Sequence, residues 1–191
     1  MATTPRFDRP GPDEHHAYYS LYIDQVRDGD ILDTLEHQIG ETAALLKAVP
    51  PSLETHRYAP GKWSIREVVG HMIDTERVFG FRGIHFARSD PAPLPSFEQE
   101  DWARVSSAHE RPLADLVDEL LAVRRGHVLF FRGLDAAAPL RRGVASGREF
   151  TVRSVPWIMA GHELHHTRIL RERYLPTHSA PQGAHATSRS P

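Results

Sequence analysis

Apolar residues in the central part of the chain recur at the spacing of an amphipathic helix. In residues 30–50 they follow a period of roughly 3.6 residues, and two prolines at the end of the segment stop the pattern. Asp30 stands immediately before the first apolar residue, where its carboxylate can accept hydrogen bonds from free backbone N–H groups. The segment is therefore predicted to form a helix that begins after Asp30 and ends before Pro50.

Two more helices are predicted on the same grounds. Ser64 and Glu67 have the spacing of a capping box, so a second helix should begin at Ser64 and continue toward Asp90. Residues 111–134 carry a third apolar stripe of helical period. The connection between them, residues 91–110, begins with a proline-rich run and then becomes polar, which leaves room for one or two helical turns.

A fourth helix is predicted to begin near Thr151 or Ser154 and to run to about Tyr174, because Pro176 follows. The glycine-interrupted segment 141–153 in front of it is expected to form a link or a short hairpin. No longer strand pattern occurs, so a parallel sheet is excluded. Four long amphipathic helices joined by linkers predict an all-α fold, a four-helix bundle.

The polar, proline-rich composition of both ends predicts tails that bury little surface. We expect a disordered N-terminal tail at residues 1–13, one bundle domain at residues 14–175 and a disordered C-terminal tail at residues 176–191. His178 and His185 fall in the C-terminal tail, where they are expected to be solvated.

Composition narrows the classes of function. The formal net charge is −2, with 25% charged residues of both signs, so no basic face argues for a nucleic-acid partner. No apolar run approaches the roughly 18 residues of a membrane span, and the N-terminus has no apolar signal core, so we expect a cytoplasmic protein. There is no cysteine, so a metal site must use His, Asp or Glu.

Among the 13 histidines, His162 and His166 stand four residues apart on the predicted fourth helix. This spacing puts both imidazoles on one face, where they can bind the same metal ion. Together with Glu163 they spell the H-E-x-x-H pattern of zinc proteases. The protease interpretation fails because Ile169 replaces the required glycine, because no second helix follows to carry a third ligand, and because there is no sheet to bind a peptide.

A third ligand must then lie upstream, and His71 is the best candidate because it sits inside the apolar stripe of the second helix. The alternative is a core histidine that is hydrogen-bonded to a neighbouring helix. Asp74, one turn later, could accept a hydrogen bond from the free ring N–H of a ligating histidine, or could pair with Arg77 or Arg82. Glu67 could act in the same way on a ligand, although its capping-box role is favoured.

Three nearby residues are expected to stay outside the set of ligands. His165 is next to a ligand but should point elsewhere, toward the surface or an interface. Glu163 lies about 100° from His162 around the helix, at the margin of the metal face, and should pair with a neighbouring arginine or with solvent. Trp102 is expected to be a packing residue or to line the entrance of the site.

Two segments of the chain resemble the signature helices of the DinB/YfiT-like superfamily, which is distinct from the DNA polymerase that shares the DinB name. The first segment has P-G-K-W-S at residues 60–64, followed by G-H-x-x-D at residues 70–74. The second has G-H-x-x-x-H at residues 161–166, and between them "LPSFEQEDWA" is similar to an acidic, aromatic connection in the family. The resemblance covers roughly residues 20–175 and has no departure at the ligand positions.

This resemblance implies a four-helix bundle that binds one divalent metal ion through His71, His162 and His166. Three imidazoles leave an open coordination position, as in catalytic sites, and they suit zinc or nickel best, with iron or manganese as alternatives. Relatives are described as metal-dependent hydrolases or as transferases that use a low-molecular-weight bacterial thiol. We therefore expect a hydrolase or a thiol transferase acting on a small molecule, with a non-catalytic metal-binding stress protein as the alternative. The resemblance also suggests a homodimer.

Overall fold

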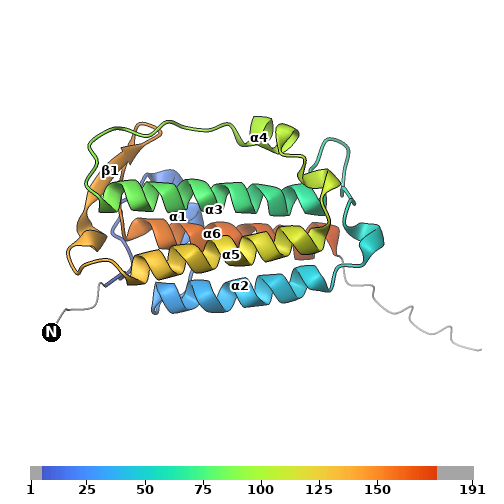
Figure 1. The fold of residues 1–191 in the computed structure, drawn as a ribbon, viewed down its shortest axis with the longest axis horizontal. Coiled ribbons are helices and arrows are strands. Elements are labelled where there is room, and N and C mark those ends of the chain that lie inside the picture. The colour runs from blue at the N-terminus through green and yellow to red at the C-terminus, as the bar shows by residue number, and fades with distance from the viewer. Residues whose placement is uncertain (1–5, 176–191) are drawn as a thin grey trace, which may run out of the picture.

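Four long helices run side by side through the structure, a computed structural model in which residues 6–175 are described (Figure 1). They are α2 (Ile31–Lys47), α3 (Ile65–Ala87), α5 (Leu113–Arg132) and α6 (Ser154–Ile169). The shorter elements are α1 (Ser20–Ile23), α4 (Gln99–Val105), the strands β1 (Arg142–Ala145) and β2 (Arg148–Thr151), four 3₁₀ turns (Ala17–Tyr19, Pro51–Leu53, Ala108–Glu110 and Ala138–Leu140), and a π-helical turn (Leu170–Tyr174) that extends α6.

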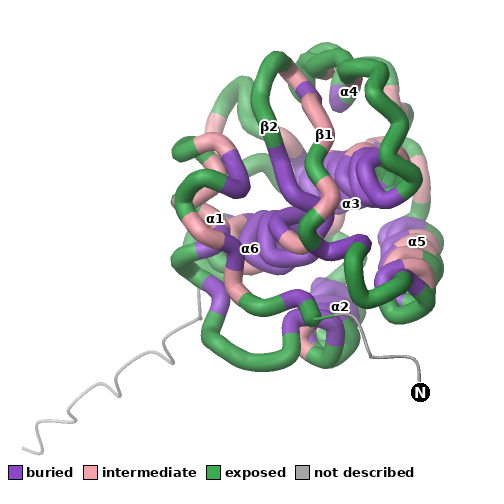
Figure 2. Tube along the Cα trace, turned by 90° about the vertical axis from the view of Figure 1, so that its left-hand side faces the viewer, coloured by how far each residue is buried: buried purple, intermediate pink, exposed green. Residues whose placement is uncertain are grey.

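The helices form a four-helix bundle, as the apolar periodicity predicted. Helices α2 and α3 each pack against both α5 and α6. In the view along the bundle, α2 and α3 therefore stand at opposite corners (Figure 2). The chain crosses the end of the bundle between them, and α3 and α6, which carry the candidate ligands, become direct neighbours.

Both predicted helix starts are confirmed in atomic detail. The Asp30 carboxylate accepts hydrogen bonds from the backbone N–H groups of Leu32 and Asp33. Ser64 and Glu67 form the complete capping box, in which each side chain accepts from the other residue's backbone N–H. A cap of this kind is worth about 1 kcal/mol, so local sequence fixes where α2 and α3 begin.

The core has two parts that follow one another along the bundle. One contains Leu35, Phe86, Phe131, Phe150 and Trp157 and lies at the end that carries the β-hairpin. The other contains Leu46, Ile65, Ile73, Leu116 and Leu170. Each such side chain contributes roughly 1.5–3 kcal/mol through its burial, so the apolar stripes hold the four helices together.

Residues 141–153, which were expected to form either a link or a short hairpin, form the hairpin. Strands β1 and β2 pair antiparallel, and Leu94 from the long connection forms a bridge with Ala145. Helix α6 begins at Ser154, as predicted, but the α-helical geometry ends at Ile169, and a π-helical turn replaces the last turn of the expected helix. None of the helices in residues 6–175 is long and apolar enough to cross a membrane.

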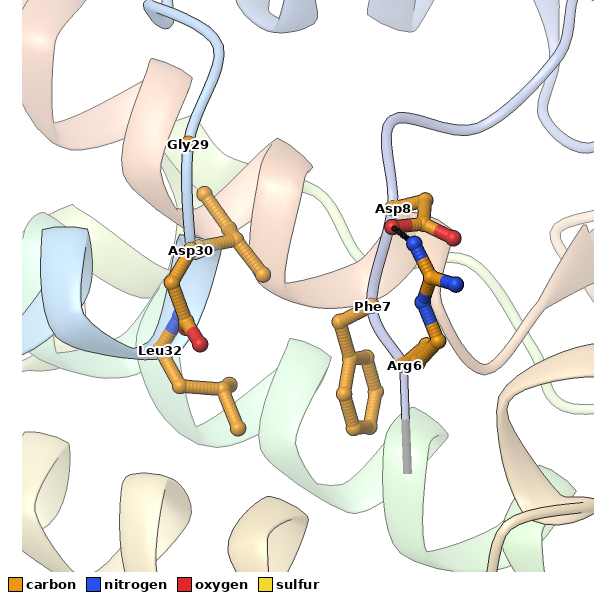
Figure 3. Close-up of a pocket in the computed structure, with 7 residues that line it drawn as sticks. Arg6, Phe7, Asp8, Gly29, Asp30 and Leu32 are labelled. Carbon is orange, nitrogen blue, oxygen red and sulfur yellow. Dashed lines mark hydrogen bonds and ion pairs between the residues drawn. The ribbon is translucent and has the colours of Figure 1, made fainter. Parts of the chain in front are cut away.

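The expectation that residues 1–13 bury little surface does not hold for Phe7 and Pro10, which are buried, whereas Arg6, Asp8, Pro12 and Asp13 are exposed. The Phe7 side chain is buried and meets Phe131 edge-on, with 5.6 Å between ring centroids. Its carbonyl oxygen accepts a hydrogen bond from the indole N–H of Trp157 at 2.9 Å. Figure 3 shows Phe7 opposite Leu32, where the two segments border a surface hollow of about 330 Å³. Residues 1–5 and the predicted tail 176–191, with His178 and His185, lie outside the described part of the chain.

The anchoring role of Phe7 leads to a stability prediction. Phe7→Ala should lower the free energy of unfolding by about 3 kcal/mol, because it leaves a cavity beside Phe131. Arg6→Ala is the matched control: its side chain is 81% exposed, so the change should stay below about 0.5 kcal/mol. Urea unfolding followed by circular dichroism measures both, and equal stability of the two variants would contradict the packing of this segment.

A second prediction concerns the acid stability of the same segment. Burial alone would raise the pKa of Glu14, but hydrogen bonds from Arg153, Gly11 and Thr151 outweigh it and lower the pKa from 4.5 to about 2. The carboxylate therefore stabilises the fold above pH 4.5, and this contribution disappears as the pH falls toward 2. Glu14→Gln should be less stable at pH 7 and should lose less stability than the wild type between pH 4.5 and 2.5, as measured by thermal unfolding.

Candidate metal centre

Helices α3 and α6 bring together the three histidines that the sequence singled out. The Nε2 atom of His162 lies 3.1 Å from Nε2 of His71 and 3.1 Å from Nε2 of His166. One ligand atom from each residue lies within 4.8 Å of the others, and all three side chains are buried. The cluster thus joins residues 91 positions apart in sequence, from two helices that are neighbours in the bundle.

The arrangement fits a metal ion better than a hydrogen-bonded cluster. A single imidazole nitrogen offers one lone pair or one N–H, so Nε2 of His162 cannot form two good hydrogen bonds with the other two rings at once. Nitrogens bound to one ion at about 2.1 Å would stand roughly 3.0–3.4 Å apart in octahedral or tetrahedral geometry. The two separations from Nε2 of His162 fall in that range, and all three ligand atoms lie within 4.8 Å of one another, so the three histidines could hold a metal ion.

Electrostatics keep the three imidazoles neutral, as metal ligands must be. Burial lowers the pKa of His71 to about 4, and nearby His165 adds to the effect. Burial and the other imidazoles lower the pKa of His162 and His166 well below 6.5, and Arg124 also lowers that of His162. At neutral pH the rings therefore present lone pairs rather than positive charges.

Aromatic rings pack against the candidate ligands. The Trp63 ring packs against His71 with centroids 4.8 Å apart, and Tyr22 packs edge-on against both His162 and His165. Tyr22 can approach because residue 161 is glycine: a Cβ there would lie 2.2 Å from the Tyr22 carbonyl oxygen. The glycine that precedes His162 is thus required for α1 to cover the histidines.

The π-helical turn after α6 contributes to the same support. It buries Tyr174, whose hydroxyl donates a hydrogen bond to the Trp63 carbonyl oxygen at 2.7 Å. The extra residue per turn rotates the end of the helix, and such distortions occur often at functional sites. Through this contact the end of α6 positions Trp63, which in turn packs on His71.

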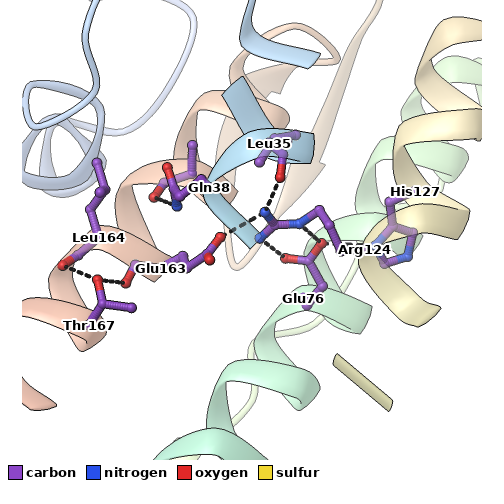
Figure 4. A network of polar contacts seen from close by, with 9 residues as sticks. Leu35, Gln38, Glu76, Arg124, His127, Glu163, Leu164 and Thr167 are labelled. Atoms are coloured by element: carbon purple, nitrogen blue, oxygen red, sulfur yellow. Dashed lines mark hydrogen bonds and ion pairs between the residues drawn. The ribbon is translucent and has the colours of Figure 1, made fainter. Parts of the chain in front are cut away.

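A buried ion network lies directly beside the histidines. The Arg124 guanidinium of α5 donates to both carboxylate oxygens of Glu76 on α3, at 2.6 and 2.9 Å, and to Glu163 on α6 at 2.7 Å (Figure 4). It also donates to the Leu35 carbonyl oxygen of α2 at 3.3 Å. Its side chain is 2% exposed. Burial would lower the pKa of Arg124, but the carboxylates of Glu76 and Glu163 raise it overall, so the group stays charged.

Glu163 is therefore placed differently from the position expected for it. The predicted pairing with an arginine is confirmed, but the partner comes from another helix and the carboxylate is buried, so the alternative of contact with solvent is wrong. A general base of a protease must reach the substrate cavity. The Glu163 carboxylate instead points to Arg124, which agrees with the rejection of the protease interpretation (Figure 4).

The two carboxylates proposed to support the ligands lie elsewhere in the described structure. Glu67 caps α3 and pairs with Arg57, contacts that outweigh its burial and lower its pKa. Asp74 is half-buried, and burial raises its pKa. Among residues 6–175, neither Asp74 nor Glu67 accepts a hydrogen bond from His71, His162 or His166, and such a contact in a metal-loaded protein stays a prediction.

Two cavities open beside the histidines. One, of about 390 Å³, is lined by Trp63, Tyr22, His165, His166 and Arg168. The other, of about 290 Å³, is lined by residues that include His71, His162 and Thr75. The Thr75 hydroxyl is buried and has no hydrogen-bond partner in the described chain. A small molecule in these cavities would meet the three imidazoles and a hydroxyl group.

His165 lies beside the three histidines, whereas Trp102 does not line the entrance to their cavities, which was one of its two expected roles. His165 is not part of the three-nitrogen cluster, as expected, and it lines the first cavity together with His166. Burial, together with Arg168, lowers its pKa. Trp102 is 42% exposed and lines a different hollow with Phe97, so it does not border the cavities beside the histidines.

Fold and site together define a four-helix bundle with a buried three-histidine centre. The model of the DinB superfamily matches residues 34–170, and the chain belongs to that superfamily. A similar solved structure is YfiT from Bacillus subtilis, described as a probable metal-dependent hydrolase with an unusual four-helix bundle topology. The match has a TM-score of 0.61 at 15% identity and covers 84% of this chain and 90% of YfiT, so it shows a shared fold. Comparison with curated proteins finds no match.

The ion network was not predicted from the sequence, although the sequence contains a signal for it. Arg124 stands four residues after Leu120 and four before Val128, inside the apolar stripe of α5, and Glu76 stands in the same way between Met72 and Gly80 in α3. A charged residue at a buried position of a helix stripe needs a charged partner. The pairing of Arg124 with Glu76 and Glu163 could not be predicted from the sequence, because it depends on which helices become neighbours.

The network leads to a prediction about stability. Arg124→Met should lower the free energy of unfolding by about 3–5 kcal/mol, because two buried carboxylates lose their common partner. Glu163→Gln should cost less, about 1–3 kcal/mol, because the amide oxygen can still accept from Arg124. Arg125→Met, an exposed change on the same helix, is the control. Chemical denaturation measures the free energy of unfolding of each variant. If Arg124→Met were as stable as Arg125→Met, the network would not be stabilising.

Proposed function

We propose that the protein is a metal-dependent hydrolase that holds one divalent ion through Nε2 of His71, His162 and His166. The observation that carries the proposal is the convergence of three neutral imidazole nitrogens beside two cavities. Zinc or nickel is the ion expected at such a nitrogen site. When bound, the ion would supply Lewis acidity and lower the pKa of a coordinated water toward about 7.

The residues of the chain can supply the remaining functions of a hydrolase. His165 borders the same cavity as His166, and its lowered pKa leaves it neutral at pH 7, so it can accept a proton from a nucleophile. Arg168, on the same wall, can bind an anionic group of a substrate. The Thr75 hydroxyl can hydrogen-bond to substrate in the adjoining cavity. Tyr22 packs over His162 and limits access of water.

Thiol transfer is the second candidate, and Arg168 favours it. A low-molecular-weight thiol with carboxylate groups would need a cation near the metal, and Arg168 lines the cavity beside His166. The chain has no cysteine, so the reacting sulfur would come from the cosubstrate. A stress protein that binds metal without turnover is the third candidate, and it has no use for substrate-sized cavities beside the ligands.

Metal content is the first test. Protein reconstituted with zinc or nickel should contain about one ion per chain by elemental analysis, since three imidazoles form one site. The double change His162→Ala with His166→Ala should abolish binding, whereas His165→Ala should leave it intact. A protein that retains its ion after the double change, or loses it after His165→Ala alone, would contradict the assignment of the ligands.

Activity of the metal-loaded protein then separates the candidates. Esters and amides are assayed alone, and electrophiles are assayed with and without bacterial thiols. A hydrolase needs no thiol and should lose at least about tenfold in rate in His165→Ala, whereas Glu163→Gln should change the rate less than tenfold. Turnover that requires the thiol and falls in Arg168→Ala would replace hydrolysis by transfer, and absence of turnover in every assay would favour the stress protein.

A further inference from the structure

A third cavity, of about 390 Å³, is lined by Phe97, which also lines the cavity that contains His71 and His162. Its walls are largely apolar and aromatic, formed by Phe81 of α3 and by Leu94, Phe97 and Trp102 of the long connection. Because Phe97 lines both, the two cavities adjoin without sharing a candidate metal ligand. A volume of this size is within the usual range for small-molecule pockets.

A buried arginine without a carboxylate partner lines this cavity. Arg82 is 2% exposed, and it forms no ion pair with any residue of the described chain. Its Nη2 donates to the Ser146 hydroxyl at 2.9 Å, and the guanidinium stacks over Phe79 at 5.0 Å. Its Nη1 has no hydrogen-bond partner among residues 6–175. A buried charge is unfavourable by several kcal/mol unless it is paired, so an arginine in this state calls for an anion.

Neighbouring charges do not compensate for Arg82. Arg77, on the same wall, is paired with Glu119 at 2.6 Å, and Arg111 pairs with the same carboxylate at 2.5 Å. Asp74 also borders the cavity, but it makes no ion pair within 4.0 Å in the described chain. The charged residues that line the cavity are Asp74, Arg77 and Arg82, so one positive charge is in excess there. Arg77 is paired with Glu119, whereas Arg82 has no ion pair among the described residues.

We propose that this cavity binds a small monocarboxylate with an apolar body. The carboxylate would accept hydrogen bonds from the Arg82 guanidinium at the floor, and the apolar body would lie among Phe81, Phe97 and Trp102. One uncompensated positive charge matches one negative charge, and a planar guanidinium suits a planar carboxylate. The aromatic walls select against small hydrated anions such as inorganic phosphate. The site is separate from the proposed metal centre and does not depend on it.

The test compares a carboxylate with its neutral isostere. Calorimetric titration with 4-phenylbutyrate and with 4-phenylbutyramide should show the carboxylate binding at least about tenfold more tightly to the wild type. Arg82→Met should reduce this preference to less than about twofold. Arg77→Met removes a charge from the same wall, but that charge is paired with Glu119, so the preference should persist. Equal affinity of the two probes for the wild type, or a preference lost in Arg77→Met instead, would overturn the proposal.

Two further measurements keep the test decisive if Arg82→Met does not fold. Trp102 is partly exposed, so Trp102→Ala should fold, and it should weaken both probes by a similar factor; unchanged binding would place the ligand elsewhere and overturn the site. Inorganic phosphate at the same concentration should not displace 4-phenylbutyrate, and displacement would contradict the selectivity. The double change His162→Ala with His166→Ala should leave both titrations unchanged, which separates this proposal from the metal-dependent function.

Discussion

The guanidinium of Arg124 is the constraint on which the arrangement of the bundle depends. It originates on α5 and binds Glu76 of α3, Glu163 of α6 and the Leu35 carbonyl oxygen of α2, so one side chain contacts every long helix. Apolar stripes hold helices together but tolerate rotation and sliding, whereas a buried charge tolerates neither, because a misplaced helix leaves it unpaired. The network therefore specifies the relative rotation of the helices and their offset along the bundle.

The relative rotation and offset of α3 and α6 matter most for the three histidines that these helices carry. Glu163 is adjacent in sequence to His162, and Glu76 lies little more than one helical turn from His71, so the contacts that fix the carboxylates also fix these histidines. A change of one residue in helix register turns a side chain by about 100° and would separate the three Nε2 atoms. The residues of the H-E-x-x-H motif therefore have other roles than in a zinc protease. Glu163 binds α6 to Arg124, and His162 and His166 line the cavities.

Local signals were enough to predict the helices and, from spacing, two candidate ligands. The apolar stripe of the second helix made His71 the best third candidate, and the family resemblance implied the same residue. Asp30 and Ser64 mark helix starts through contacts with their own neighbours in sequence, which is why they could be found without a structure. Phe7 and Arg124 could not be placed, because their partners lie on distant segments that become neighbours only in the fold. Sequence shows which residues need partners, and topology decides which partners they obtain.

Buried polar and charged groups in this bundle are of two kinds: those that are paired within the fold and those that remain available to a ligand. Arg124 and Arg82 are almost equally buried, yet Arg124 has two carboxylate partners and Arg82 has none in the described chain. The fold therefore supplies Arg124 with acidic partners, but it leaves the charge of Arg82 without one among the described residues. His162 also lacks a full set of partners within the fold. Its Nε2 atom lies close to Nε2 of both His71 and His166, and it cannot form good hydrogen bonds with both. Three buried side-chain atoms of the described chain have no hydrogen-bond partner: Arg82 Nη1, the Thr75 hydroxyl oxygen and Glu163 Oε1. Arg82 and Thr75 line two cavities that both include Phe97, so a bound molecule could supply the missing partner there.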